Sequence, residues 1–365
     1  MVLGLDSTKG DDAFYSIGGN NHYFTMGNQL QRQGYFSLSF HNGYYNYYHR
    51  ELTHTNIGYD AFIASGQHLE KLCGNIYPPD VPLFEKTMPL YLEHAPFSVY
   101  YMTLSGHAPY QRDSYFVGKY YKEVDAFFGD EYAEKTKYYI CYQMELERAL
   151  TSLVEELEKA GIADDTVIVM TGDHYPYGLG NGSAWGNDRD YIQDLIKGDD
   201  RLYWNEDKSG LIIWSGCLER ELKDKACTIT DPVMSLDILP TVSNLFGVEF
   251  DSRLLPGRDV FAENTEPLVF WNNLSWVTRE GKYDTRKREY HPAEDTTIPE
   301  DRQEEYIKYI SGIVDNRILM SSSIMKLDYY RMLFGDDTDG KDPEAVWASL
   351  QEEIKAREEG NAVGL

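Results

Sequence analysis

The chain has 365 residues, with 34 Lys and Arg against 60 Asp and Glu, and therefore a formal charge of −26. A hydrophobic fraction of 42% is typical of a folded globular protein with a sizeable core. The acidic balance argues against a nucleic-acid partner, because phosphate backbones require a basic protein surface. No stretch approaches the roughly 20 apolar residues of a transmembrane helix, and Met1 to Gly10 lacks the apolar core of a secretory signal.

Strand-like and helix-like segments alternate along the first two thirds of the chain. Short apolar, β-branched runs predict strands, and apolar residues at helical spacing predict helices. The predicted strands are 35–40, 97–104, 166–170 and 211–214, and the predicted helices are 23–33, 82–93, 131–160 and 232–246. This alternation predicts an α/β fold with a mostly parallel central sheet flanked by helices.

The pattern changes after residue 261. Predicted strands at 268–271, 276–283 and 318–325 favour a smaller antiparallel subdomain, followed by a polar terminal helix at 343–359. The charged, proline-containing segment 286–305 is predicted to be a surface loop. We therefore divide the chain into an atypical N-terminal segment (1–19), a core (20–261) and a C-terminal part (262–365).

The cysteines and tyrosines carry weaker signals. The four cysteines, at 73, 141, 217 and 227, form no CxxC pair, so we interpret them as buried free thiols rather than a zinc site. The 30 tyrosines combine large rings with hydroxyls, which suits a groove for sugars or polar headgroups. Ordinary half-buried packing explains the same composition.

Two predicted strands end in residues that can carry chemistry. Ligands of open α/β sheets bind at the carboxyl ends of the strands. Asp173 and His174 follow the strand 166–170 behind a glycine, and together they offer a hard oxygen and an imidazole to one divalent cation. His107 follows the strand 97–104 and is predicted to bind an anionic oxygen or transfer a proton. A surface loop and a structural histidine are the alternatives.

A third cluster, residues 40–50, holds His41, His49 and Arg50 among four tyrosines in an otherwise acidic chain. The planar fork of an arginine binds phosphate or sulfate oxygens in pairs. Arg50 is therefore the predicted oxyanion clamp. The alternative is an aromatic surface loop.

These clusters, in this order, resemble the extracellular catalytic domain of lipoteichoic acid synthases, within the sulfatase and alkaline phosphatase superfamily. The resemblance covers about residues 20 to 275. The matching segments are Phe40-His41-Asn42-Gly43, Tyr48-His49-Arg50, Gly58-Tyr59-Asp60, Ser105-Gly106-His107-Ala108-Pro109, Asp173-His174-Tyr175, Ser235 to Thr241, and Gly257-Arg258-Asp259.

The resemblance implies a phosphoglycerol transferase that moves glycerol phosphate from phosphatidylglycerol through a phospho-threonine, with one Mn²⁺ or Mg²⁺. Asp173 and His174 would then be metal ligands, and His41, His107 and Arg50 would surround the phosphate. Tyr48 stands where the family has Trp and would cover the glycerol. The partner would be a phosphatidylglycerol-like headgroup or an anionic glycopolymer, at the extracellular face of a bacterial plasma membrane.

One departure concerns the nucleophile. The family carries a metal-binding Glu and the nucleophilic Thr before the region that matches here, whereas residues 1–19 offer no apolar strand bearing Glu. Ser7 and Thr8 lack the expected context, and His49 replaces the Asn of the family. We therefore expect no nucleophile in this chain, weak metal binding, little turnover of phosphatidylglycerol and a tendency to aggregate.

Two further interpretations stay open. A sulfatase or a phosphoethanolamine transferase would keep the fold and change the leaving group. The sulfatase motif Cys/Ser-x-Pro-x-Arg does not occur here. A non-catalytic protein would instead bind an anionic glycopolymer through Arg50, His107 and the tyrosines, without requiring a metal.

Overall fold

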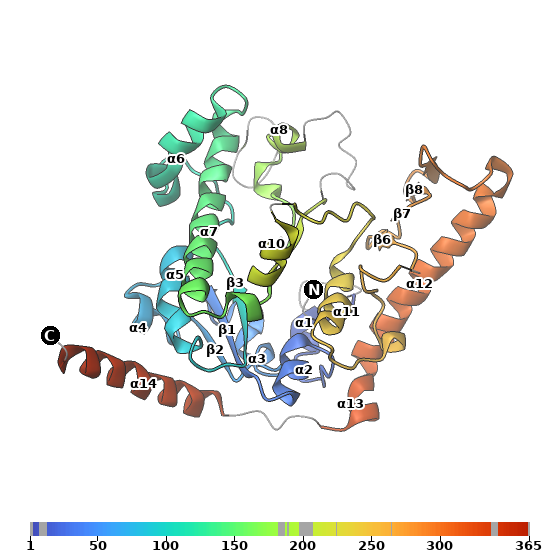
Figure 1. Ribbon diagram of the computed structural model, residues 1–365. Helices are drawn as coiled ribbons and strands as arrows, with labels where there is room; N and C mark the ends of the chain where they lie inside the picture. Colours follow the sequence, from blue (N-terminus) through green and yellow to red (C-terminus); the bar gives the residue numbers. More distant parts are fainter. Residues whose placement is uncertain are drawn as a thin grey trace.

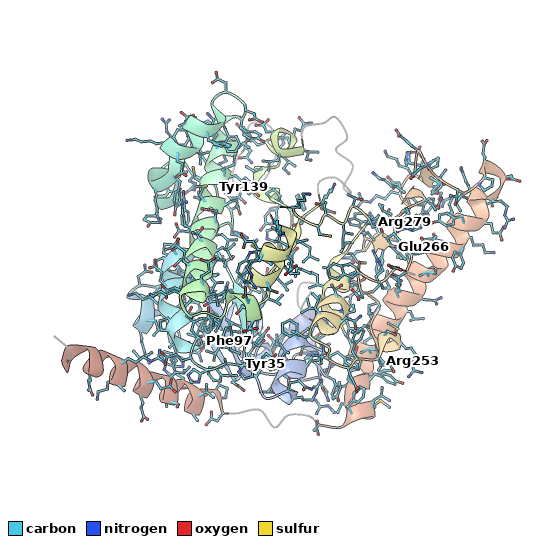
Figure 2. The ribbon with its side chains drawn as sticks, viewed as in Figure 1. Tyr35, Phe97, Tyr139, Arg253, Glu266 and Arg279 are labelled. Atoms are coloured by element: carbon cyan, nitrogen blue, oxygen red, sulfur yellow. The ribbon has the colours of Figure 1, made fainter. Side chains whose placement is uncertain are left out.

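The computed structural model describes residues 3–6, 13–181, 187, 190–196, 207–223, 225–263, 265–336 and 342–363. At its centre lies a three-stranded parallel sheet in the order β2-β1-β3, with β1 at Phe36–Tyr44, β2 at Ala61–Ser65 and β3 at Phe97–Met102. Tyr35 and Phe97 lie close together where β1 and β3 begin (Figure 2). All strands of this sheet are parallel, which confirms the predicted fold class.

Helices cover the sheet and extend beyond it (Figure 1). The α-helices are α1 Ala13–Ser16, α2 Met26–Arg32, α3 Arg50–Thr53, α4 Leu69–Cys73, α5 Asp80–Thr87, α6 Tyr115–Phe128, α7 Glu134–Lys159, α8 Ile192–Ile196, α10 Gly216–Leu222, α11 Ile238–Leu245, α12 Gln303–Leu327, α13 Tyr329–Phe334 and α14 Pro343–Val363. The short 3₁₀ helices are η1 Tyr47–His49, η2 Met88–Leu90, η3 Ala163–Asp165, η4 Tyr177–Leu179, η5 Ser235–Asp237, η6 Ser252–Leu254 and η7 Glu300–Arg302.

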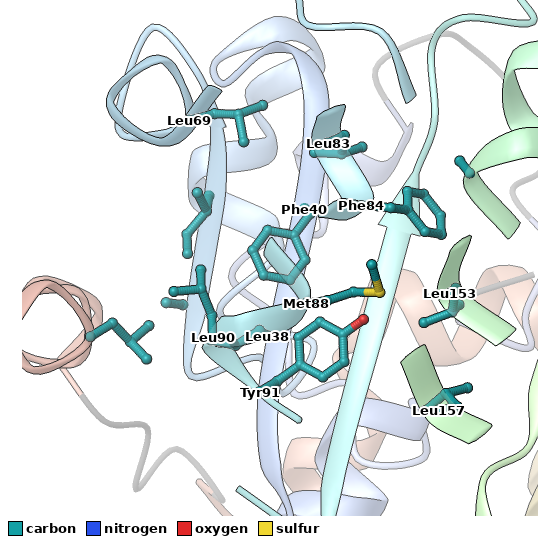
Figure 3. Close-up of a cluster of buried hydrophobic side chains, with 14 of the residues drawn as sticks. Leu38, Phe40, Leu69, Leu83, Phe84, Met88, Leu90, Tyr91, Leu153 and Leu157 are labelled. Atoms are coloured by element: carbon teal, nitrogen blue, oxygen red, sulfur yellow. The ribbon is translucent and has the colours of Figure 1, made fainter. Parts of the chain in front are cut away.

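The main core lies between the central sheet and helices α5 and α7 (Figure 3). Leu38 and Phe40 of β1 are fully buried, as is usual for the middle strand of a parallel sheet with both faces covered. Leu83 of α5 and Leu157 of α7 pack into the same cluster. Each such side chain contributes about 1.5–3 kcal/mol of burial free energy, so this cluster fixes the position of the ends of β1 and β3.

The pair β4 (Ile168–Thr171) and β5 (Leu211–Trp214) differs from the expected parallel arrangement. These strands form a separate two-stranded antiparallel sheet, with Ile168 opposite Trp214. Both strands lie where the sequence predicted them. A run of four apolar residues indicates a strand but carries no information about its direction, so the antiparallel pairing could not be read from the pattern.

The C-terminal part contains an antiparallel meander, β6 (Leu268–Phe270), β7 (Trp276–Thr278), β8 (Gly281–Asp284) and β9 (Glu289–Pro292), which packs against α12. The strand predicted at 318–325 is wrong, because these residues belong to α12. Its buried positions, among them Ile310, Val314 and Ile324, recur at helical spacing over 25 residues, and a window of eight residues hides that period.

The segment 286–305 is likewise not a continuous loop, because it contains β9, η7 and the first turn of α12. β9 is an exposed edge strand whose polar residues lack the apolar alternation that identifies a strand. The predicted helix at 343–359 is confirmed as α14, which packs beside β2 through Trp347 and Leu350.

The cysteines have no disulfide partners, but only Cys141 is buried, and Cys227 is exposed. The prediction of buried thiols is therefore wrong for most of them. Within the described residues, none of the helices combines the length and apolarity that crossing a bilayer requires.

Candidate active site

His41 and Arg50 form the first half of the site, at the carboxyl end of β1. The Nδ1 atom of His41 donates to the backbone oxygen of Met102 on the neighbouring strand, at 2.8 Å. A carbonyl can only accept, so Nδ1 carries the proton and Nε2 keeps its lone pair in the neutral ring. Arg50, the first residue of α3, donates to that Nε2 at 3.4 Å. The two residues predicted to bind the oxyanion are thus in contact.

Burial sets the charge of this pair. Burial, together with the smaller effect of the Arg50 charge, lowers the pKa of His41 to about 4, so the imidazole is neutral near pH 7. Burial also lowers the pKa of Arg50, while Tyr100 and Asp173 act in the opposite direction. Arg50 stays charged, because arginine titrates far above neutral pH. The site therefore presents one permanent cation beside a neutral imidazole.

Gly43 makes room for the His41 ring. A Cβ atom at residue 43 would lie 2.2 Å from Nε2 of His41. The register between β1 and β2 shifts between His41 and Tyr44, as it does at a β-bulge. Bulges re-aim side chains near functional sites, and here the irregular stretch contains the predicted site residue and the glycine beside it.

Tyr48 borders Arg50 in a strained segment. Tyr48 and His49 both adopt left-handed backbone conformations, with φ of 55° and 54°. The guanidinium carbon of Arg50 lies 5.4 Å from the centre of the Tyr48 ring and 5.7 Å from that of Tyr47. His49 points elsewhere: its ring stacks on Tyr15 of α1, with centroids 3.9 Å apart. The structure thus places the ring of Tyr48, rather than that of His49, beside Arg50.

His107 lies in the loop after β3. Its Nδ1 donates to the backbone oxygen of Ala108 at 2.7 Å, and its Nε2 accepts from the hydroxyl of Tyr177 at 3.1 Å. The loop is anchored by buried Asp80, which accepts from the backbone N–H of Ser105 and donates its own N–H to the Ser105 hydroxyl. Asp80 also accepts from the side chain of Asn42, the residue after His41. This network ties the His107 loop to the end of β1.

Asp173 and His174 follow β4. His174 donates from Nδ1 to the backbone oxygen of Tyr175 at 2.9 Å, and its Nε2 lies 3.6 Å from a carboxylate oxygen of Asp173. The side chains are 77% (Asp173) and 39% (His174) exposed, so both are open to solvent. A carbonyl that holds the proton on one ring nitrogen leaves the other nitrogen for a metal. This donor set of one carboxylate and one imidazole suits a divalent cation as part of a larger shell.

The two halves of the site adjoin. The rings of His107 and His174 meet edge to face with centroids 5.6 Å apart, and Tyr177 packs against His174 with centroids 4.8 Å apart. The negative charge of Asp173 acts to raise the pKa of both Arg50 and Tyr100. The predicted phosphate-binding and metal-binding residues therefore converge, although their roles stay predictions.

Sequence reasoning missed Tyr177 and the carbonyl of Met102. Tyr177 lies 70 residues from its partner His107. The only feature of the sequence that pointed to Tyr177 is that it is the third aromatic residue in the run after Asp173.

Ser7 and Thr8, the hydroxyls near the N-terminus, lie outside the described residues. In the part of the chain that the structure describes, no group of three or more His, Cys, Asp and Glu side chains is placed to hold a metal ion.

Other matching motifs are structural. Asp60 is buried and accepts from the side chain of Gln31 and from the backbone N–H of Ser37. Asp237 accepts from the backbone N–H groups of Met234 and Arg258. Both carboxylates therefore accept hydrogen bonds that hold neighbouring segments of the fold together.

Comparison with known proteins identifies the family and the fold of this chain. The family model described as Sulfatase matches residues 5–248. Lipoteichoic acid synthase 1 of Bacillus subtilis is 23% identical over 352 residues, which cover 94% of this chain and 51% of that protein. Lipoteichoic acid synthase of Staphylococcus saprophyticus is 25% identical over 74% of this chain and 40% of its own length. The chain thus spans about half the length, or less, of these relatives.

Two solved structures share the fold. The lipoteichoic acid synthase LtaP from Listeria monocytogenes superposes with a TM-score of 0.63 at 18% identity, over 89% of this chain and 78% of LtaP. A protein of the alkaline phosphatase superfamily from Vibrio parahaemolyticus superposes with a TM-score of 0.57 at 16% identity, over 90% of this chain and 74% of that protein.

Proposed function

Because this chain belongs to the sulfatase family, we propose that it is a metal-dependent phosphoglycerol transferase of the lipoteichoic acid synthase type. The observation that carries the proposal is the convergence of Arg50 and His41 on one side with Asp173, His174 and His107 on the other. One arginine and three imidazoles meet here in a chain whose net charge is −26. An acidic surface repels anions generally, so such a site serves a specific anionic group.

Each residue of the candidate site would have a different role, which its side-chain chemistry determines. Arg50 would hold the phosphate oxygens through its planar fork, with its orientation supported by Nε2 of His41. His107 would hold a proton near the leaving oxygen on Nε2, where the Tyr177 hydroxyl now binds. Tyr48 would cover the glycerol with its exposed ring. Asp173 and His174 would hold Mn²⁺ or Mg²⁺, which supplies charge neutralisation at the phosphate when it is bound.

The same residues indicate which phosphate donor the site would accept. A phosphatidylglycerol-like headgroup carries one phosphodiester and a small polyol, which fits one arginine beside one exposed aromatic ring. An anionic glycopolymer is the alternative partner. Such a donor lies in a membrane, so we place the site at the extracellular face of a bacterial plasma membrane, as in the family that the sequence resembles.

Ligand binding tests the proposal directly. Calorimetry would measure glycerol phosphate binding with and without Mn²⁺ for the parent chain and for Arg50→Ala and Asp173→Ala. We expect Mn²⁺ to strengthen binding, Asp173→Ala to remove that gain, and Arg50→Ala to weaken binding at least tenfold. Arg253→Ala and Asp315→Ala are matched controls, because these charges are exposed outside the site.

Turnover separates the alternatives. Labelled phosphatidylglycerol in vesicles, a phosphoethanolamine lipid and an aryl sulfate would be offered in parallel. We expect little turnover of phosphatidylglycerol, because no residue of this chain is predicted to be the nucleophile. Faster cleavage of the sulfate ester would overturn the proposal in favour of a sulfatase. Polymer binding that is unchanged by Mn²⁺ and by Asp173→Ala would overturn it in favour of a non-catalytic binding protein.

A further inference from the structure

Two arginines lie near the buried carboxylate of Asp237, where the core meets the C-terminal part of the chain. Arg258, in the loop after η6, is 9% exposed, and Arg317 is a half-buried residue of α12. We name these two residues the arginine pair. The elements that carry them are packed together, because Leu236 of η5 and Val314 of α12 belong to one buried apolar cluster.

The charges of this cluster do not cancel. Burial has the largest effect on Arg317 and lowers its pKa; the charge of Asp237 opposes this effect, and the charge of Arg258 acts in the same direction as burial. Burial raises the pKa of Asp237, and both arginines oppose that effect. Arginine keeps its charge in proteins. Two permanent cations therefore lie near a single carboxylate.

The nearby carboxylates are occupied by other donors. The oxygens of Asp237 accept the backbone N–H groups of Met234 and Arg258, at 3.0 and 2.9 Å. Asp231, whose pKa the Arg258 charge acts to lower, is bound by the guanidinium of Arg279 at 3.1 and 2.6 Å. Within the described residues, no carboxylate forms an ion pair with either member of the arginine pair.

Most hydrogen-bond donors of the pair are unused. The terminal nitrogens of Arg258 donate to the hydroxyl of Thr265 at 3.2 Å and to the backbone oxygen of Pro232 at 3.3 Å, whereas its buried Nε has no partner. Arg317 forms no hydrogen bond or ion pair with any residue that the structure describes. A desolvated charge without partners is costly. The bonds of Arg258 explain its place in the fold, but nothing comparable explains Arg317.

We propose that the arginine pair binds a small tetrahedral oxyanion, of the phosphate or sulfate class, between the Arg258 loop and α12. Each guanidinium fork binds two oxygens of such an anion. A carboxylate has only two oxygens, which one fork would already occupy, so a tetrahedral anion suits two forks better. The bound anion would balance the excess positive charge and join the C-terminal part to the core.

This site is independent of the proposed transferase function. Among the described residues, no hydrogen bond or ion pair links the arginine pair to Arg50, His107 or Asp173. Binding of the anion requires neither Mn²⁺ nor turnover. It can therefore be measured in Arg50→Ala protein with a metal chelator present, where the candidate active site contributes little to phosphate binding.

Thermal denaturation and calorimetry with inorganic phosphate, sulfate and acetate test the proposal at matched ionic strength. We expect phosphate and sulfate, but not acetate, to raise the melting temperature of Arg50→Ala protein. Adding Arg317→Gln should abolish the rise and weaken phosphate affinity at least tenfold. Arg302→Gln is the matched control, because it removes the same charge from a 63% exposed side chain just before α12.

Stability without the anion distinguishes a binding site from a structural arginine. If Arg317 waits for an anion, Arg317→Gln removes an unpaired, partly buried cation, so in anion-free buffer the variant should melt at or above the parent temperature. Arg317→Met, which keeps the apolar stem of the side chain, should behave in the same way.

Three results would overturn the proposal. The first is a phosphate-induced rise of equal size with and without Arg317. The second is an equal rise with acetate, which would indicate a general salt effect. The third is a lower melting temperature of both Arg317 variants in anion-free buffer, which would indicate a structural role. None of these results bears on Mn²⁺-dependent binding at Arg50, so the proposed function and this site can fail separately.

Discussion

Replacement of Gly43 by alanine tests whether the position of the His41 ring controls the oxyanion site. The added Cβ atom would lie 2.2 Å from Nε2 and 2.8 Å from Cε1 of His41. Ordinary contacts are longer by about an ångström or more, so the ring must move. It has little room, because it is 4% exposed and its other side is bonded to the Met102 carbonyl at 2.8 Å.

The size of the effect follows from these contacts. Overpacking costs about 1–3 kcal/mol, and loss of the Met102 hydrogen bond costs about 1 kcal/mol more. Displacement of Nε2 also removes the support of Arg50. We therefore expect a lower melting temperature and at least a tenfold weaker affinity for phosphate, which corresponds to about 1.4 kcal/mol. Thermal denaturation and calorimetry measure the two effects separately.

A double-mutant cycle isolates the cause. If the clash with the ring is responsible, Gly43→Ala costs far less stability in a His41→Ala background, where no ring remains. Gly312→Ala is the control: this glycine in α12 has open space around it, so alanine adds about 0.5–1 kcal/mol of helix stability. A Gly43→Ala protein with parental melting temperature and parental phosphate affinity would refute the reasoning.

Two further predictions concern stability away from the site. Burial lowers the pKa of His22 to about 4, so protonation of the unfolded chain removes stability as the pH falls from 6.5 towards 4; we expect His22→Asn to reduce the loss between pH 7.5 and pH 5 by about 2 kcal/mol in denaturant titrations. Trp347→Ala should destabilise the protein by about 3–5 kcal/mol, because this ring is 3% exposed in the main core, whereas Phe127→Ala, at 81% exposure, should cost under about 0.5 kcal/mol in the same titrations.

The local pattern of apolar residues was sufficient to predict a helix or strand where a single hydrophobic period ran through the whole segment. The helix predicted at 131–160 became α7, and the strand predicted at 211–214 has the bounds of β5. The errors in prediction occur where the apolar pattern is too short or too mixed with polar residues to distinguish helix, strand and loop. β2, a buried run of five residues, and the amphipathic α6 were not predicted at all, and within α12 only residues 318–325 were assigned to an element, a strand. Strand direction depends on tertiary pairing, which explains the antiparallel β4 and β5.

The candidate site likewise has residues that the sequence identified and partners that only the fold reveals. Each of its predicted residues lies at or shortly after a strand end, and residue type together with that position identified them. Their partners could not be identified in this way, because the Met102 carbonyl lies 61 residues from His41 and the Tyr177 hydroxyl lies 70 residues from His107. A backbone carbonyl has no sequence signature. The contacts that orient the imidazoles are therefore properties of the fold.

Those contacts follow one rule. In His41, His107 and His174, Nδ1 donates to a backbone carbonyl, so each proton is fixed on the same nitrogen. The opposite nitrogen, Nε2, faces Arg50 in His41, the Tyr177 hydroxyl in His107 and the Asp173 carboxylate in His174. The neutral His41 ring carries no charge to attract an anion. Under the proposed function, Arg50 and a cation held at Asp173 and His174 would supply that attraction, so loss of Asp173 should weaken phosphate binding only when Mn²⁺ is present.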